Sequence, residues 1–289
     1  MLKKSRIMLV VLLLFFMGIS TCTVLADDFL ELVKDASPEE VQEAIDAGAD
    51  VNARGEAGMT PLIWAARTNN PEVIEILLDN GADTNARTEK GRTALMEAVD
   101  YNSSPEVIGL LLDKGADITA RDEFGTTALM LAAKGNKNLE VIEVLLNNGA
   151  DINAKNEFGY TALMLAVANN TNPEFVETLL GRDADIKARN INKNTVLMFA
   201  AMYNNNPEVV EILLDRGADI DARNKLGMTA LMFAASFNSN PKIINFLLDN
   251  GADGSLKCDK GKTAFDYAKE NEELRGTDAY WRLNDAQYE

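Results

Sequence analysis

The sequence repeats itself with a period of about 34 residues along most of its length. The motif Gly-x-Thr-Ala-Leu-Met-x-Ala returns with small variations at a constant spacing, and only the first step is one residue shorter than the others. Its threonines are Thr60, Thr93, Thr127, Thr161, Thr195, Thr229 and Thr263. Such a period indicates one small structural unit per repeat, which buries its apolar face only by stacking on its neighbours. The sequence therefore predicts a solenoid, which presents surface and seldom encloses a reaction chamber.

Two further markers keep the same period. Gly-Ala-Asp precedes each threonine at one fixed distance, at Gly48, Gly81, Gly115, Gly149, Gly217 and Gly251, with Asp183 in the remaining place. Pro-Glu precedes each glycine at another fixed distance, at Pro38, Pro71, Pro105, Pro173 and Pro207, with Leu139 and Pro241 completing the series. The repeat length varies only in the Asn-rich stretch before the proline, where we expect a surface turn.

The order of these markers resembles the ankyrin repeat, whose pattern runs Gly-x-Thr-Pro-Leu-His-x-Ala-Ala, a turn, a second helix ending in Leu-Leu, and Gly-Ala-Asp-x-Asn. The resemblance covers about residues 28–275. Tetratricopeptide units share the period but lack a Gly-Ala-Asp-Val-Asn finger. The resemblance implies an all-α solenoid of stacked helix-turn-helix units with projecting β-hairpin-like fingers. The expected repeats are an N-cap at 28–57, then 58–90, 91–124, 125–158, 159–192, 193–226 and 227–260, and a C-cap at 261–289.

Within one repeat, local signals predict two helices and a finger. Thr127 is expected to cap a first helix over 128–134, and a second helix is expected to begin near Leu139 and to end at Gly149. The family's histidine is replaced by Ile63, Met96, Met130, Met164, Met198, Met232 and Asp266. We expect thioether packing in place of the polar contact made by that ring.

Residues 1–26 carry the features of a secretory signal peptide. Lys3, Lys4 and Arg6 precede an apolar run over 7–17, and small residues end at Ala26. This apolar run is shorter than the roughly 20 residues needed to span a bilayer. We expect cleavage after Ala26 and a mature domain over 27–289, in the periplasm or outside the cell. The alternative is a lipoprotein acylated at Cys22, which the threonine before it disfavours.

The charge of the chain limits its partners. Cleavage would remove three basic and no acidic residues, so the net charge would change from −17 to −20. Such a surface repels nucleic acid and anionic lipid, and it attracts a basic protein. A second interpretation is that the acidity only keeps an exported surface soluble. We expect a protein partner, no nucleic acid, no membrane insertion after cleavage, and a monomer.

The sequence shows no catalytic constellation. The chain contains no histidine, which excludes Ser-His-Asp and Cys-His arrangements and imidazole ligands for zinc. The Asp-x-Gly-Ala-Asp segments lack the alternating ligands and closing glutamate of a calcium loop. After cleavage Cys258 is the only cysteine, so no intramolecular disulfide can form. We expect no enzyme activity, no cofactor and no metal site.

The resemblance also implies where a partner binds. In proteins similar to this one, the partner lies across the finger tips and the concave face of the first helices, at positions that vary between repeats. Here these positions gather apolar and aromatic residues, which typically anchor interfaces. We predict a peptide- or protein-binding groove, with the alternative that several of its members only pack on the neighbouring finger. Its residues are Tyr101, Phe124, Phe158, Tyr160, Met202, Tyr203, Leu226, Met228 and Phe237.

One finger departs from the pattern. Asp183 and Lys193 stand where other repeats have glycine, at positions that favour a positive φ. We expect strain of about 1 kcal/mol at each and a displaced finger, either as a recognition feature or as tolerated drift.

The sequence thus predicts a non-enzymatic scaffold for protein–protein interaction. The alternative is an exported inhibitor or effector that blocks a partner enzyme. A third function, stabilising redox enzymes of the cell envelope, is neither supported nor excluded by any residue.

Overall fold

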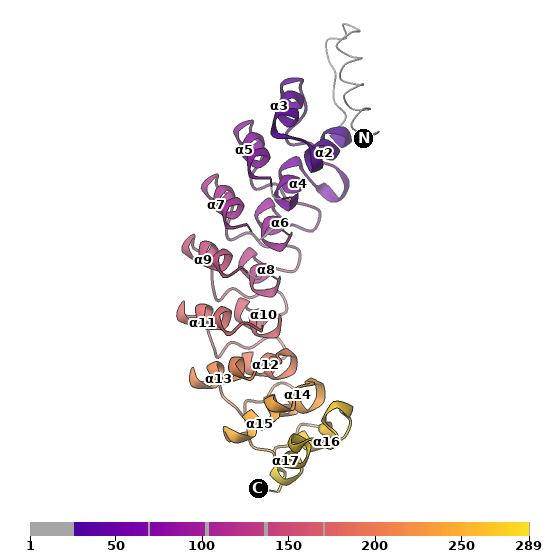
Figure 1. The fold of residues 1–289 in the computed structure, drawn as a ribbon, viewed down its shortest axis with the longest axis vertical. Coiled ribbons are helices and arrows are strands. Elements are labelled where there is room, and N and C mark those ends of the chain that lie inside the picture. The colour runs from indigo at the N-terminus through magenta and orange to yellow at the C-terminus, as the bar shows by residue number, and fades with distance from the viewer. Residues whose placement is uncertain (1–25, 69, 102–103, 136–137, 170, 289) are drawn as a thin grey trace. The chain divides into compact units, whose positions relative to one another are not determined.

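The computed structural model describes residues 26–68, 70–101, 104–135, 138–169 and 171–288. The predicted signal peptide therefore lies, except for Ala26, outside the described residues. Two compact units are distinguished among the described residues, a first unit within Met1–Glu123 and Glu143–Gly149 and a second unit within Phe124–Ile142 and Ala150–Glu289. Each unit is a stack of helix pairs (Figure 1), so the predicted all-α solenoid of helix-turn-helix repeats is confirmed.

In the first unit, the first and second helices of successive repeats pack in two rows. Helix α2 packs on α4 and α4 on α6, while α3 packs on α5 and α5 on α7. The first-helix row contains α2 (Ala26–Asp35), α4 (Pro61–Thr68) and α6 (Ala94–Tyr101). The second-helix row contains α3 (Pro38–Asp46), α5 (Pro71–Asp79) and α7 (Pro105–Asp113), and a 3-10 turn, η1, covers Glu56–Gly58.

The second unit repeats this arrangement. Its first helices pack in the order α8, α10, α12, α14, α16, and its second helices in the order α11, α13, α15, α17. The first helices are α8 (Ala128–Gly135), α10 (Ala162–Asn169), α12 (Val196–Tyr203), α14 (Ala230–Phe237) and α16 (Ala264–Ala268). The second helices are α11 (Pro173–Gly181), α13 (Pro207–Asp215), α15 (Pro241–Asp249) and α17 (Asp278–Ala286), with the turn η2 (Glu272–Leu274) before the last. Helix α9 (Leu139–Asn147) is divided between the two units.

The helices begin where the capping residues predict. The backbone N–H of Met130 donates to the Thr127 hydroxyl at 3.3 Å, and Asn206 caps α13 with a proline next to it. Ser37 and Glu40 form a capping box at α3. The cap of each first helix lies in the buried layer, because the marker threonines are at most 8% exposed.

Methionines fill the interior at the position of the family's histidine. Met96, Met130, Met164, Met198 and Met232 are all at most 2% exposed, which confirms thioether packing. At two of these positions the replacing side chain still accepts a hydrogen bond from the backbone N–H of the marker threonine. The Met198 sulfur accepts the Thr195 N–H at 3.3 Å, and the Asp266 carboxylate accepts the Thr263 N–H at 3.0 Å.

The fingers of the second unit are joined by one backbone hydrogen bond per repeat. The N–H groups of Glu157, Ile191, Lys225 and Asp259 donate to the carbonyls of Phe124, Phe158, Asn192 and Leu226 at 2.9–3.1 Å. Among the described residues the fingers contain no extended strand, and one isolated bridge joins Arg189 and Thr195. The fingers are therefore turns held in register by their neighbours.

The irregular finger has the expected strain but not the expected displacement. Asp183 has φ 65° and Lys193 has φ 60°, which confirms that both residues occupy the left-handed region. The prediction of a displaced finger is wrong, because Ile191 and Asn192 still bond to the fingers on either side. Two backbone bonds hold the segment in line despite the missing glycines.

Asparagine side chains connect successive repeats at two levels. Near the base of one finger, Asn153 donates to the Asp183 carbonyl at 3.1 Å and accepts the Asp185 N–H at 2.8 Å. Below the first helices, the buried Asn238 donates to the carbonyls of Ala201 and Asn204, both at 2.9 Å. These amides satisfy carbonyls that the helix ends leave unpaired.

The chain ends in a helix that covers the last repeat. Leu283 and Ala279 of α17 are fully buried, whereas Trp281 is 57% exposed. Helix α17 therefore lies within the C-cap expected over 261–289. In the described part of the chain, none of the helices has both the length and the apolar character required to cross a bilayer.

Candidate functional site

Five aromatic side chains of the second unit form a continuous row from the finger tips to helix α12. Ring centroids are 6.2 Å apart for Phe124 and Phe158, and 6.3 Å apart for Phe158 and Tyr160. They are 5.3 Å apart for Tyr160 and Phe199, and 6.5 Å apart for Phe199 and Tyr203. All four spacings lie within the range of favourable aromatic pairs. We call these five residues the aromatic row.

Local structure fixes each member of the row. Phe158 and Tyr160 flank a glycine with positive φ, and both of their N–H groups donate to the Asn156 side chain at 3.1 and 2.9 Å. Phe199 and Tyr203 are four residues apart on α12 and therefore share one face of that helix. The row is held by a braced turn at one end and a helix at the other.

The row borders a shallow hollow of about 190 Å³. It is lined by Tyr160, Phe199 and Tyr203 of the row and by Met164, Leu165, Ala168 and Asn169 of α10. Phe199 is only 7% exposed and lies underneath, whereas Phe158 and Tyr203 are 45% and 53% exposed. The hollow has the size of one apolar side chain, and it offers no converging acid, base or nucleophile.

The remaining predicted site residues lie outside the aromatic row and differ in their exposure. Leu226 and Phe237 are well exposed in the second unit, and Phe237 stacks on Phe233 with centroids 6.3 Å apart. Met202 is half-buried on α12. Met228 is 8% exposed, so it packs inside rather than offering surface. Tyr101 belongs to the first unit.

Two residues of this surface were missed by sequence reasoning. Phe199 connects the two halves of the aromatic row, and Ile191 is 51% exposed in the irregular finger. A signal for Phe199 existed, since the position after each Leu-Met varies between repeats and lies one helical turn before Tyr203. Ile191 carried no such signal, because its finger has no regular counterpart.

In the first unit, the equivalent helix face carries cations on aromatic rings. The Arg67 guanidinium lies 3.9 Å from the Tyr101 ring centroid and 5.1 Å from that of Trp64. Lys34 lies 4.2 Å from the Trp64 ring centroid. These contacts are cation–π interactions, so Tyr101 is covered on one face by a charged side chain.

Glu97 anchors the arginines of this face. Its carboxylate lies 2.8 Å from Arg92 and 3.6 Å from Arg67, and Arg92 also pairs with Asp100 at 2.7 Å. Burial raises the pKa of Glu97, an effect that both arginines oppose. The network orients guanidinium groups and presents no group positioned to act on a ligand.

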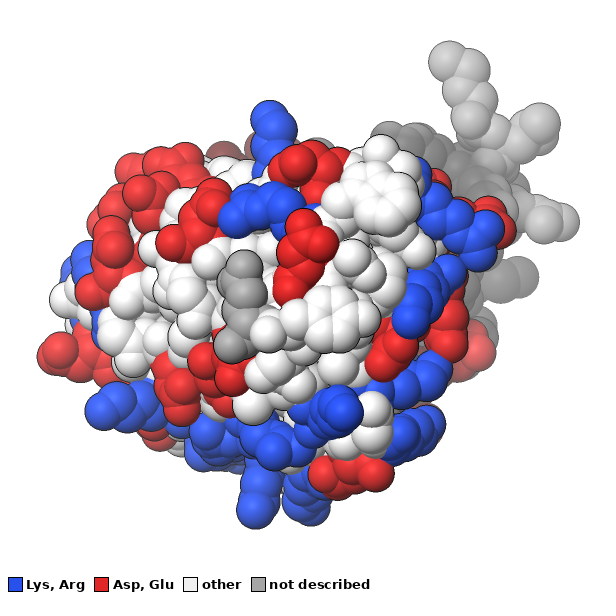
Figure 2. Space-filling view, turned by 90° about the horizontal axis from the view of Figure 1, so that it is seen from below, with Lys and Arg blue, Asp and Glu red and all other residues white. Residues whose placement is uncertain are grey.

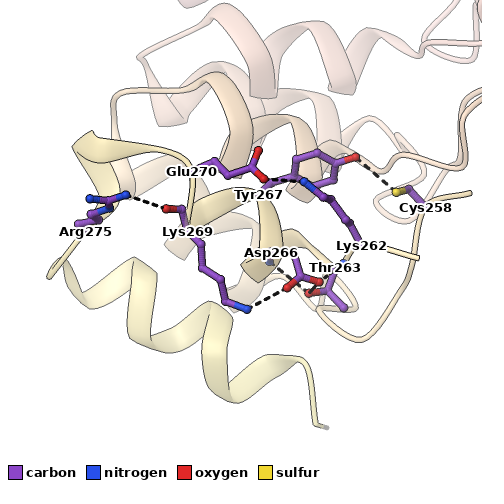
Figure 3. Close-up of polar contacts among 8 residues, drawn as sticks. All are labelled: Cys258, Lys262, Thr263, Asp266, Tyr267, Lys269, Glu270 and Arg275. Carbon is purple, nitrogen blue, oxygen red and sulfur yellow. Dashed lines mark hydrogen bonds and ion pairs between the residues drawn. The ribbon is translucent and has the colours of Figure 1, made fainter. Parts of the chain in front are cut away.

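The only cysteine among the described residues, Cys258, contacts the C-terminal cap (Figure 3). Its sulfur lies 3.4 Å from the Tyr267 hydroxyl, and Lys262 pairs with Glu270 at 2.6 Å beside the Tyr267 ring. Burial raises the pKa of the Cys258 thiol, but hydrogen bonds from Tyr267 and the backbone outweigh it and lower the pKa. The same contact raises the pKa of Tyr267 to about 12. Because the thiol is buried, we assign it a packing role.

No group of three or more carboxylate or cysteine side chains that could hold a metal ion occurs in the part of the chain that the structure describes.

Comparison with known proteins agrees with the architecture. The family model for ankyrin repeats (3 copies) matches three times, over residues 30–122, 106–190 and 197–276. A comparison with curated proteins finds no match. The three matched segments together cover most of the chain and coincide with its stacked helix pairs. The chain therefore belongs to the ankyrin-repeat family.

Proposed function

We propose that the protein is an exported, non-enzymatic scaffold that binds a protein partner through the aromatic row of its second unit. Ankyrin repeats indicate a protein–protein interaction scaffold, and proteins built from them are generally not enzymes. The observation that carries the proposed site is the contiguity of the row. Five rings follow one another at 5.3–6.5 Å along exposed finger tips and one helix.

Rigidity supports this assignment. Exposed aromatic side chains on a fixed backbone are the usual anchors of an interface, because they bury a large area and lose little conformational entropy. The finger backbone is held by Asn156 and by the bond from Glu157 to Phe124 at 3.0 Å. A hollow of about 190 Å³ beside Tyr203 would accept one apolar side chain of a partner.

A matched pair of variants tests the site. The protein is used to capture partners from envelope and secreted fractions, alongside Tyr160→Ser/Tyr203→Ser and the control Trp281→Ser. Trp281 is 57% exposed, close to the 53% of Tyr203, but it lies on α17, outside the row. We expect the double variant to lose the captured protein and the control to keep it. Capture that survives in the double variant would refute the site.

The proposal of export depends on residues 1–26. Expression with the complete sequence, followed by intact-mass measurement, should give a chain beginning at Asp27 in the periplasm or the medium. A lipid-modified chain beginning at Cys22 would favour the lipoprotein alternative. An unprocessed chain in the cytoplasm would refute export.

The inhibitor alternative makes a different prediction for the same captured partner. If the partner is an enzyme, its turnover should fall in proportion to the fraction bound. Unchanged turnover at saturating binding would leave the scaffold function and exclude inhibition.

A further inference from the structure

The fingers of the second unit are basic although the whole chain is strongly acidic. The distal halves of its four fingers, residues 154–161, 188–195, 222–229 and 256–263, contain eight Lys or Arg and two acidic residues, in a chain of net charge −17. The basic residues are Lys155, Arg189, Lys193, Arg223, Lys225, Lys257, Lys260 and Lys262. The acidic residues are Glu157 and Asp259.

Two second helices of this unit carry the opposite charge. Helices α11 and α13 of the second-helix row carry five acidic residues and no basic one. Fingers and second helices form separate rows, since fingers bond to fingers and second helices pack on second helices. On the face drawn in Figure 2, Lys and Arg gather along the lower edge of the view and Asp and Glu are frequent at the upper left. Net charge therefore does not describe the finger surface.

The arginines of these fingers donate hydrogen bonds to neighbouring fingers, whereas several of the lysines form no ion pair among the described residues. The Arg189 guanidinium donates to the Arg223 carbonyl at 2.9 Å, and Arg223 donates to the Lys257 carbonyl at 2.6 Å. Lys193, Lys225 and Lys260 are exposed, and within the described ranges none of them has an ion-pair partner. Their ammonium groups are available to a ligand.

Two of these lysines, Lys193 and Lys225, lie next to exposed apolar residues at the finger tips. Lys225 precedes Leu226, which is 58% exposed, and Lys193 follows Ile191 by two residues. Ile191 in turn donates its N–H to Phe158 of the aromatic row at 3.1 Å. Charge and apolar surface thus alternate along the same row of fingers.

We propose that the partner presents an extended, acidic peptide segment that also contains apolar or aromatic side chains. Its carboxylates pair with Lys193, Lys225 and Lys260, and its apolar side chains lie on the aromatic row. The proposal rests on the proposed function and adds the charge of the partner. It reverses the expectation of a basic partner that the net charge gives, because a ligand at short range responds to local charge within a Debye length of about 10 Å.

A peptide fits these fingers better than a continuous polyanion. A nucleic acid or an anionic bilayer presents dense negative charge, which Glu157, Asp259 and the carboxylates at the finger bases repel. A peptide places its few carboxylates beside the three free lysines and its apolar groups beside the rings.

A selection experiment tests the charge of the partner. A display library of random dodecapeptides is selected on the immobilised protein at physiological ionic strength. We expect enriched peptides to be rich in Asp and Glu next to Phe, Tyr, Trp or Leu. Enriched peptides that are neutral or basic would overturn the inference and leave the proposed function standing. The absence of any enrichment would contradict both.

Two charge-reversal variants locate the binding. Lys225→Glu/Lys260→Glu acts on the fingers, and Arg216→Glu/Lys242→Glu makes the same change of net charge near the ends of second helices. For an enriched peptide, the finger variant should weaken binding about tenfold or more, and the control less than about twofold. Equal loss in both variants would overturn the inference.

Further binding measurements distinguish the charge proposal from the aromatic-row proposal, and a peptide from other anionic ligands. Tyr160→Ser/Tyr203→Ser should also weaken peptide binding, and unchanged binding there would refute the aromatic row while leaving the charge intact. Vesicles of phosphatidylserine and phosphatidylcholine, and a short oligothymidine, should not bind at the same ionic strength. Binding of either one more tightly than the selected peptides would overturn the proposal.

Discussion

Replacing Asp221 with asparagine should stabilise the second unit. Asp221 stands at the position where Asn52, Asn85 and Asn153 each join two repeats through a donated and an accepted hydrogen bond. Asp221 accepts the Asp253 N–H at 3.0 Å, but a carboxylate has no N–H with which to donate to a carbonyl. One of the two inter-repeat bonds is therefore absent when Asp221 is ionised.

The expected gain follows from that missing bond. A neutral intramolecular hydrogen bond contributes about 1 kcal/mol, and the neutral amide also removes repulsion from the nearby Asp253 and Asp219 carboxylates. We expect Asp221→Asn to raise the free energy of unfolding by about 1–2 kcal/mol at pH 7. The reverse change at an intact site, Asn153→Asp, should lower it by about 1 kcal/mol.

The gain should depend on pH. Burial is the main reason that the pKa of Asp221 is raised, with the two neighbouring carboxylates adding to it. An acid with a raised folded-state pKa costs stability above that pKa, and the cost disappears once the group is protonated in both states. The difference in the free energy of unfolding between Asp221→Asn and the parent protein should therefore become smaller as the pH falls towards about 4. Once protonated, Asp221 can donate a hydrogen bond as the amide does.

Urea unfolding followed by circular dichroism at pH 7, 5.5 and 4 measures both effects. Differences between variants at one pH are compared, because repeat arrays can unfold in more than one step. An Asp221→Asn variant no more stable than the parent at pH 7 would refute the missing bond as a source of instability. A gain equally large at pH 4 would refute the role of the ionised carboxylate.

Three further substitutions, two of them with a matched control substitution, test the packing of the second unit by the same unfolding measurement. Lys193→Gly should stabilise by about 0.5–1 kcal/mol, because φ is 60° at this position; a loss would show that the lysine side chain contributes more than its strain costs. Gly159→Ala should lower the free energy of unfolding by at least about 1 kcal/mol more than Gly251→Ala does. A Cβ at residue 159 would lie 2.9 Å from the Ile191 nitrogen, whereas a Cβ at residue 251 would meet nothing within 4 Å. Equal losses in the two variants would contradict this steric effect. Asn238→Ala should cost about 3 kcal/mol, because it leaves two buried carbonyls without their donor, and the exposed Asn205→Ala should change stability by less than about 0.5 kcal/mol.

The repeat pattern was sufficient to predict the helices. Markers such as Thr127 and Pro207 recur at one spacing and each has a local physical role, so helix starts follow from the sequence alone. The first helix predicted over 128–134 is observed at Ala128–Gly135. The strain at Lys193 was likewise predictable, because the missing glycine marks a position of positive φ.

The details of the surface depend on contacts between repeats. Met228 and Leu226 both lie near a finger tip, yet one is 8% and the other 58% exposed, and no local pattern separates them. The irregular finger keeps its place through backbone bonds to its neighbours, which composition does not record. The net charge suggested a basic partner because a sum over the chain hides the basic fingers.

The hydrogen bonds between successive fingers also set a spacing. Neighbouring helices pack about 8–10 Å apart, and finger tips joined by one bond per repeat advance at the same pitch. A polyproline II helix brings every third residue to the same side after about 9.3 Å, whereas a β-strand turns alternate residues away. A ligand in the polyproline II conformation would place every third side chain at a finger, so side chains three residues apart would determine its binding.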